Sequence, residues 1–141
     1  MLALLCAAAS FSTHAEAYKS GAYVVQYSVV NSMLLPAAVA DRYGFKRSGE
    51  RAIISVTLQR PSKNEPLQAL PAQVSGQAKT LLEQRQELDF RQVDDGDSAI
   101  SLAEFKLAEK EQTLTFELRI KPADSERTIP LRFTETLYQQ P

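Results

Sequence analysis

Only two residues of this 141-residue chain have side chains that ordinarily carry thiol or imidazole chemistry at neutral pH, and both lie near its N-terminus. Cys6 is the single cysteine and His14 the single histidine. Ser-His-Asp and Cys-His nucleophiles, and the usual zinc sites, require one or both of these residue types. Whether such chemistry is available therefore depends on whether the first residues remain part of the mature protein.

The first 17 residues have the pattern of a signal peptide for export. Residues 1–11 form an almost uninterrupted apolar run, which is too short to span a bilayer but suits the hydrophobic region of a signal peptide. Ala15 and Ala17 place small residues at the −3 and −1 positions of a cleavage site, which predicts Tyr18 as the mature N-terminus. We therefore expect a signal peptide over residues 1–17, one mature domain over 18–141, and a periplasmic location.

Cleavage at this point would remove Cys6, His14 and the acidic Glu16. The mature chain could then build neither a thiol redox centre nor a Cys/His zinc site, and we expect no cofactor and no metal. Sixteen acidic and sixteen basic residues would remain, so the formal net charge would be zero. This balance gives no basic footprint for nucleic acid or for an anionic membrane surface, and we expect a domain that is not embedded in the membrane.

Carboxylates are the remaining candidates for chemistry. Asp94, Asp95 and Asp97 surround Gly96, which favours a hairpin turn over a Ca²⁺ loop because the spacing differs from that of the known loop. Glu104 lies where the apolar phase of its segment shifts. Either a β-bulge near Ala103 and Glu104, which can accompany a functional site, or a central strand that is buried on both faces at its start, with Glu104 at an exposed edge, explains the shift. A structural role is favoured over a functional one, because bulges also serve plain sheet geometry.

The segment 31–51 is the strongest candidate for a binding site, because it interrupts the strand pattern and concentrates basic residues. Loops and insertions on a rigid scaffold are where binding residues usually lie, and arginine binds carboxylate or phosphate with two parallel hydrogen bonds. The plain alternative is a solvated surface with local ion pairs. The candidate binding residues, together with Glu104, are Asn31, Arg42, Tyr43, Arg47 and Arg51.

Alternation of apolar and polar residues predicts the strands that must position these groups. The expected strands lie near residues 23–29, 52–59, 70–79, 87–93, 98–108, 113–121 and 129–137. A short helix is expected over Pro36 to Tyr43, with Leu35, Val39 and Tyr43 on its inward face and Gly44 just past its end. About seven short strands predict an all-β, immunoglobulin-like antiparallel sandwich with one helical insertion, and a small barrel is the alternative.

Several stretches, in order along the chain, are similar to one protein family. They include the Tyr-Val-Val-Gln-Tyr sequence at 23–27, the Leu-Pro-Ala-Ala-Val-Ala sequence at 35–40, Tyr-Gly-Phe-Lys-Arg-Ser at 43–48 and Leu-Asp-Phe-Arg at 88–91. In their order and spacing they resemble a family of small exported proteins of Gram-negative bacteria that is known only as a domain of unknown function. The resemblance covers essentially the whole of 18–141. It implies a periplasmic β-sandwich and no particular activity.

Three functions follow from these observations. The leading hypothesis is a non-catalytic periplasmic binding or interaction module, with segment 31–51 contacting an envelope protein or a small ligand. The second is an envelope chaperone or assembly factor that acts by strand addition at a free sheet edge. The third is a carboxylate-based hydrolase of an envelope glycan, centred on Glu104 and the aspartates of the 94–97 turn.

Overall fold

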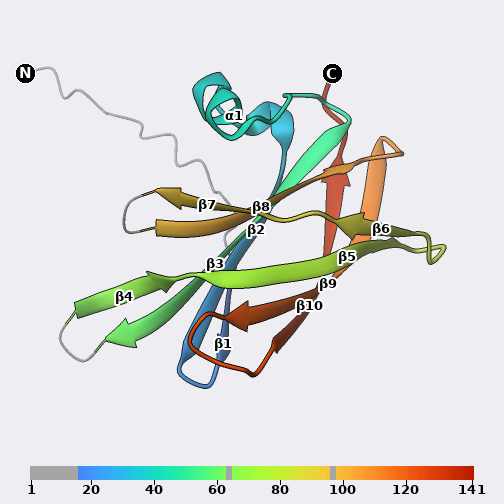
Figure 1. Ribbon diagram of the computed structural model, residues 1–141. Coiled ribbons are helices and arrows are strands. Elements are labelled where there is room, and N and C mark those ends of the chain that lie inside the picture. The colour runs from blue at the N-terminus through green and yellow to red at the C-terminus, as the bar shows by residue number, and fades with distance from the viewer. Residues whose placement is uncertain (1–15, 63–64, 96–97) are drawn as a thin grey trace, which may run out of the picture.

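Antiparallel strands make up most of the protein (Figure 1). The computed structural model describes residues 16–62, 65–95 and 98–141, so most of the expected signal peptide lies outside the described residues. The strands are β1 (Glu16–Ser20), β2 (Tyr23–Asn31), β3 (Arg51–Ser62), β4 (Glu65–Leu70), β5 (Ala72–Thr80), β6 (Arg85–Leu88), β7 (Arg91–Asp95), β8 (Ser98–Lys106), β9 (Glu111–Pro122) and β10 (Ile129–Tyr138). A 3₁₀ turn η1 (Ser32–Leu34) and a helix α1 (Ala37–Tyr43) lie between β2 and β3.

The strands form two separate sheets. Sheet A has the order β1-β2-β3-β8-β7, with β4 paired to the second half of β3, and sheet B has the order β10-β9-β5-β6. Every pairing is antiparallel. Because the sheets do not close on one another, the fold is a sandwich, and the all-β sandwich prediction is confirmed.

The main core lies between the two sheets. Its buried side chains come from alternate positions of the central strands, as period-two burial requires. Phe105 of sheet A packs edge-on against Phe116 of sheet B at a ring-centre distance of 5.4 Å. Phe133 stacks on Phe116 at 4.9 Å and also meets Tyr27 at 4.3 Å. These contacts tie the sheets together and make the sandwich a rigid scaffold for the segments outside it.

The structure contains more strands than the sequence pattern predicts. Pro71 separates β4 from β5, which belong to different sheets, so the strand expected near residues 70–79 begins in one sheet and continues in the other. The strand expected near 87–93 is likewise divided into β6 in sheet B and β7 in sheet A.

Within the described residues, no helix is both long and apolar enough to cross a membrane.

Strand β8 has no bulge. It pairs with β3 in continuous register from Arg51 opposite Lys106 to Val56 opposite Ser101. Phe105 points into the main core, whereas Leu102 is buried on the opposite face of sheet A beneath the insertion. The shift in apolar phase therefore comes from burial on both faces and not from a bulge.

Candidate binding site

The insertion between β2 and β3 is fastened to the sandwich by buried polar side chains. The Asn31 amide donates to the carbonyl oxygens of Gly49, at 2.9 Å, and Tyr138, at 3.0 Å, and its oxygen accepts from the Met33 amide at 2.9 Å. The side chain thus joins the start of the insertion, its end and the C-terminal strand. Because Asn31 is only 5 % exposed and its amide is fully engaged, its role in the structure is to close the base of the insertion.

A second pair of hydrogen bonds closes the same base. The Ser32 hydroxyl donates to the Ser48 carbonyl at 2.7 Å and accepts from the Ser48 amide at 2.8 Å. Gly49 lies against the C-terminal segment, whose Gln140 amide donates to the Gly49 carbonyl at 3.0 Å. A Cβ at Gly49 would lie 1.7 Å from the Gln140 carbonyl oxygen, so this close approach requires glycine.

Helix α1 covers part of the outer face of sheet A. Gly44 ends the helix in the left-handed conformation, with φ of 75°, which reverses the chain so that Phe45 packs back toward the sheet. Phe45, Ala40, Ile53 and Leu102 form a second buried cluster that is separate from the main core. Arg91 of β7 lies over the Phe45 ring at 4.8 Å and donates to the Tyr43 carbonyl at 3.2 Å, so β7 also holds the C-terminal end of the helix.

The helix leaves part of this outer face uncovered, and the remaining space is a groove of about 790 Å³. We call it the insertion groove. It lies between the insertion and the strands β2, β3 and β8, and it extends along the last residues of β10, from Thr136 to Tyr138, as far as Gln140. Its apolar lining includes Val30, Leu34, Leu35, Pro36, Val39, Tyr43, Ile53, Ile100 and Leu102. Leu34 is 67 % exposed at its rim, which places an apolar side chain where a partner can reach it.

Besides Asn31, the polar residues that line the insertion groove are Ser28, Ser55, Thr57, Thr136 and Gln140, with the tyrosines Tyr43 and Tyr138. The hydroxyls of Ser28 and Ser55 bond to each other at 2.7 Å, and the Asn31 amide is engaged as described. Sites for organic ligands are typically concave and mostly apolar, with volumes of about 300–1,000 Å³. The insertion groove has these properties, so it suits a largely apolar group. Among the described residues, no three His, Cys, Asp or Glu side chains come together as metal ligands.

The six residues predicted from the sequence do not all meet at one place. Asn31 and Tyr43 line the insertion groove. Arg47 donates to the Met33 carbonyl at 3.0 Å, and Arg42 lies over the Tyr43 ring with its guanidinium carbon 5.8 Å from the ring centre. The last two of the six, Arg51 and Glu104, form an ion pair with each other on the outer face of sheet A.

Glu104 is therefore engaged by a guanidinium group. Its side chain is 17 % exposed, and its cross-strand neighbour on β3 is the apolar Ile53. Asp94 and Asp95 lie at the end of β7, and Asp97 lies outside the described residues.

Most residues of the insertion groove were not singled out as binding residues from the sequence. Leu35 and Val39 were expected to face inward, and they do line the groove, but the space beside them could not be foreseen from helical spacing. The usable signal was the apolar character of both phases in β3 and β8, at Ile53, Ile100 and Leu102. Strands that are apolar on both faces must be covered on both, and a seven-residue helix covers such a face incompletely.

Comparison with known proteins gives a family and a fold. The sequence model of DUF4426, described as a domain of unknown function, matches residues 17–140. A crystal structure of a DUF4426 family protein from Pseudomonas aeruginosa PAO1 is similar, with 27 % sequence identity and a TM-score of 0.77. The alignment covers 90 % of this chain and 97 % of that chain. No curated protein matches the sequence.

Proposed function

This chain belongs to the DUF4426 family, and we propose that it is a non-catalytic periplasmic binding module that holds an apolar segment of an envelope protein in the insertion groove. The groove itself is the observation that carries the proposal: about 790 Å³ of largely apolar surface beside an insertion that is firmly fastened to a rigid sandwich. Exposed apolar surface of this kind ordinarily marks an interaction site.

The neighbouring sheet edge favours a protein segment over a small molecule as the occupant. In the described part of the chain, strand β1 pairs with β2 from Ser20 opposite Tyr23 to Glu16 opposite Tyr27, and after the expected cleavage this pairing would begin at Tyr18 opposite Val25. Beyond Tyr27, the only strand paired with β2 in the described part of the chain is β3. An extended segment placed along this edge would have main-chain groups to bond, and its alternate side chains would reach the insertion groove.

The same edge supports a second candidate function, that of an assembly factor acting by strand addition. The two functions differ in their partners, because a module with one partner recognises the shape of the groove, whereas strand addition depends mainly on main-chain hydrogen bonds and accepts many sequences. The hydrolase hypothesis gains no comparable support from the described residues, since Arg51 engages the Glu104 carboxylate.

The test is crosslinking capture of the tagged protein from intact cells, followed by sequencing of its mature N-terminus. Val39→Trp would fill the insertion groove, in which Val39 is half-buried. Ala38→Trp is the matched control, because it adds the same side chain at an exposed neighbouring position of the same helix. Thermal unfolding of both variants shows whether the fold is retained.

We expect the wild-type protein and Ala38→Trp to capture the same folded envelope protein, and Val39→Trp to recover about tenfold less of it, a difference in binding of about 1.4 kcal/mol. Equal recovery by Val39→Trp would contradict the groove proposal. Recovery of many unrelated unfolded proteins would replace it with strand addition. Capture of no protein, with a small molecule retained by the purified wild type in native mass spectrometry, would refute the protein partner. An N-terminus other than Tyr18 would contradict the expected cleavage.

A further inference from the structure

The turn between β5 and β6 carries two adjacent leucines at its tip. Leu81 and Leu82 are the two most exposed of the large apolar side chains in the described part of the chain. Neither belongs to the main core or to the second cluster beneath the insertion. Thr80 is the last residue of β5 that pairs with β9, so both leucines lie beyond the pairing of β5 with the rest of sheet B. Figure 1 shows this turn at the right-hand extremity of the molecule.

Hydrogen bonds hold the two leucines in a defined turn. The Glu83 amide donates to the Thr80 carbonyl at 3.0 Å, which places Leu81 and Leu82 at the two central positions of a four-residue turn. The Thr80 amide donates to the Gln84 carbonyl at 2.9 Å, and the Gln84 amide donates to the Thr80 hydroxyl at 3.1 Å. Glu83 adopts the left-handed conformation, with φ of 63°, and among the described residues it is the only non-glycine residue with positive φ. Such a conformation persists only where the surrounding contacts fix it, so the leucines are presented on a rigid tip.

Leucine is an unusual choice for both central positions. Tight turns ordinarily use Gly, Pro, Asn, Asp or Ser, because these residues suit the turn backbone or bond to it. Leu81 and Leu82 do neither, and their exposure means that they gain no burial in the folded chain. Residues that break a local rule without a structural gain are expected at functional positions. We therefore look for an apolar environment outside the chain that would receive them.

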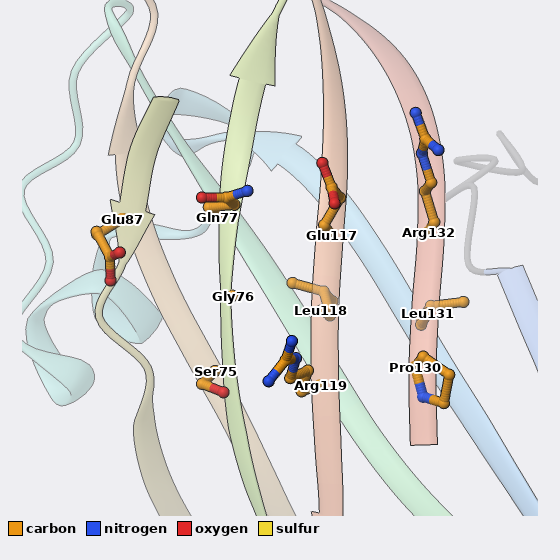
Figure 2. A pocket seen from close by; sticks show the side chains of 10 residues that line it. All are labelled: Ser75, Gly76, Gln77, Glu87, Glu117, Leu118, Arg119, Pro130, Leu131 and Arg132. Atoms are coloured by element: carbon orange, nitrogen blue, oxygen red, sulfur yellow. The ribbon is translucent and has the colours of Figure 1, made fainter. Parts of the chain in front are cut away.

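The surface around the tip is polar, which limits what that environment can be. Figure 2 shows a concavity of about 610 Å³ on the outer face of sheet B, where β5 and β6 present Ser75, Gln77 and Glu87. Lys79 and Arg85 are directly opposite each other just behind the tip. A specific protein interface buries roughly 800 Å² on each partner around an apolar centre, and two leucines bordered by polar groups supply only a small part of that area. A lipid bilayer accepts a small convex apolar tip, because it needs no complementary pocket.

The charges beside the leucines allow a shallow contact with a bilayer. Residues 79–85 contain two basic residues and one acidic residue, a net charge of +1. Lys79 is engaged with Glu117 at 3.4 Å, but Arg85 is exposed, and an arginine can lay its stem along apolar surface while its guanidinium group stays among lipid headgroups. The Glu83 carboxylate directly follows the leucines and favours water, so it keeps the contact shallow. The apolar side chains, and not charge, must therefore supply most of the affinity.

We propose that the turn carrying Leu81 and Leu82 inserts into the interfacial layer of a lipid bilayer and holds the domain on a membrane surface. Both leucines enter the boundary between headgroups and acyl chains, Arg85 lies at the level of the phosphates, and the rest of the domain stays in water. Two leucines bury fewer carbons than a myristoyl chain, which by itself binds only marginally, so the contact is weak and reversible. It is independent of the insertion groove and leaves the proposed function unchanged.

The first test is sedimentation of the purified protein with phosphatidylcholine vesicles. We expect the wild type to sediment with the vesicles at millimolar lipid, and the double variant Leu81→Ser/Leu82→Ser to bind at least about tenfold more weakly. Vesicles of equal parts phosphatidylcholine and phosphatidylglycerol should bind the wild type no more than about fivefold more tightly, the effect of one net positive charge. Val39→Trp, which fills the insertion groove, should bind vesicles as the wild type does, so the failure of either proposal can be distinguished from that of the other.

A second test reads the position of the tip directly. The chain contains no tryptophan, so a single introduced tryptophan reports only its own surroundings. We expect the fluorescence of Leu82→Trp to shift to shorter wavelength when phosphatidylcholine vesicles are added. Ala38→Trp, on the exposed side of α1, is the matched control and should show no shift.

Four outcomes would overturn the proposal. The first is the absence of wild-type sedimentation at millimolar lipid, and the second is equal sedimentation of the wild type and the double serine variant. The third is an unchanged emission of Leu82→Trp in the presence of vesicles. The fourth is a shift of that emission that needs no vesicles and grows with protein concentration, which would make a second copy of the chain the partner of the tip. Circular dichroism of each variant shows whether the fold is retained, so a loss of binding can be assigned to the leucines.

Discussion

Replacing Asn31 by aspartate tests whether its side chain closes the base of the insertion. The change keeps the shape of the side chain and the oxygen that accepts from the Met33 amide. It replaces the nitrogen that donates to the Gly49 and Tyr138 carbonyls with a second acceptor. At neutral pH a buried carboxylate oxygen would then face the same two carbonyl oxygens, and neither contact would have a hydrogen-bond donor.

The expected cost is large for a single substitution. Loss of two hydrogen bonds costs about 2 kcal/mol, and burial of an unpaired charge raises the total to roughly 3–5 kcal/mol, against the 5–15 kcal/mol by which proteins of this size are typically stable. Because the fold disfavours the ionised form, the introduced carboxyl has a folded-state pKa above its unfolded value of about 3.9. The cost of Asn31→Asp is therefore full well above that folded-state pKa and shrinks as the pH falls toward the unfolded value, where the protonated carboxyl can donate to one carbonyl.

Urea unfolding followed by circular dichroism, at pH 7 and at pH 3.5, measures this effect as a difference from the wild type. Gln73→Glu is the matched control, since it makes the same change of amide to carboxylate at an exposed position of β5. We expect the control to stay within about 0.5 kcal/mol of the wild type at pH 7. A deficit for Asn31→Asp below about 1 kcal/mol at pH 7, or one that does not shrink at pH 3.5, would refute the assigned role of Asn31.

Three further measurements test other parts of the structure. In the chain that still carries residue 16, burial and a hydrogen bond to the Glu16 carboxylate raise the pKa of Tyr27 from 10.0 to about 12. The neutral form is favoured in the fold, so the stability of this uncleaved chain should fall by roughly 2–3 kcal/mol as the pH rises from 10 to 12, and Tyr27→Phe should abolish that part of the slope in alkaline unfolding curves. A double-mutant cycle on Arg51 and Glu104, with both replaced by methionine, should give a coupling energy of about 1 kcal/mol, because the pair is only partly exposed. Leu81 and Leu82 are 78 % and 82 % exposed at the turn between β5 and β6, so replacing both with serine should change the free energy of unfolding by less than about 0.5 kcal/mol.

The fold could be predicted from the sequence where burial alternates along a single strand. In β9, Leu114, Phe116, Leu118 and Ile120 are all buried, as their spacing indicates. Alternation does not reveal where a chain leaves one sheet for the other, because burial continues in phase through such a crossing. The strand pattern continues past Pro71 for this reason, although β4 and β5 lie in different sheets.

The candidate site could be predicted only in part. The sequence placed it in the insertion, because the insertion breaks the strand pattern, and its basic residues suggested an anionic partner. The structure shows that Asn31 is occupied by carbonyls 18 and 107 residues away in the sequence. Contacts at such separations leave no local pattern in the sequence. The hydrogen bonds of Asn31 that close the base of the insertion, and the groove beside them, could therefore be identified only from the folded chain.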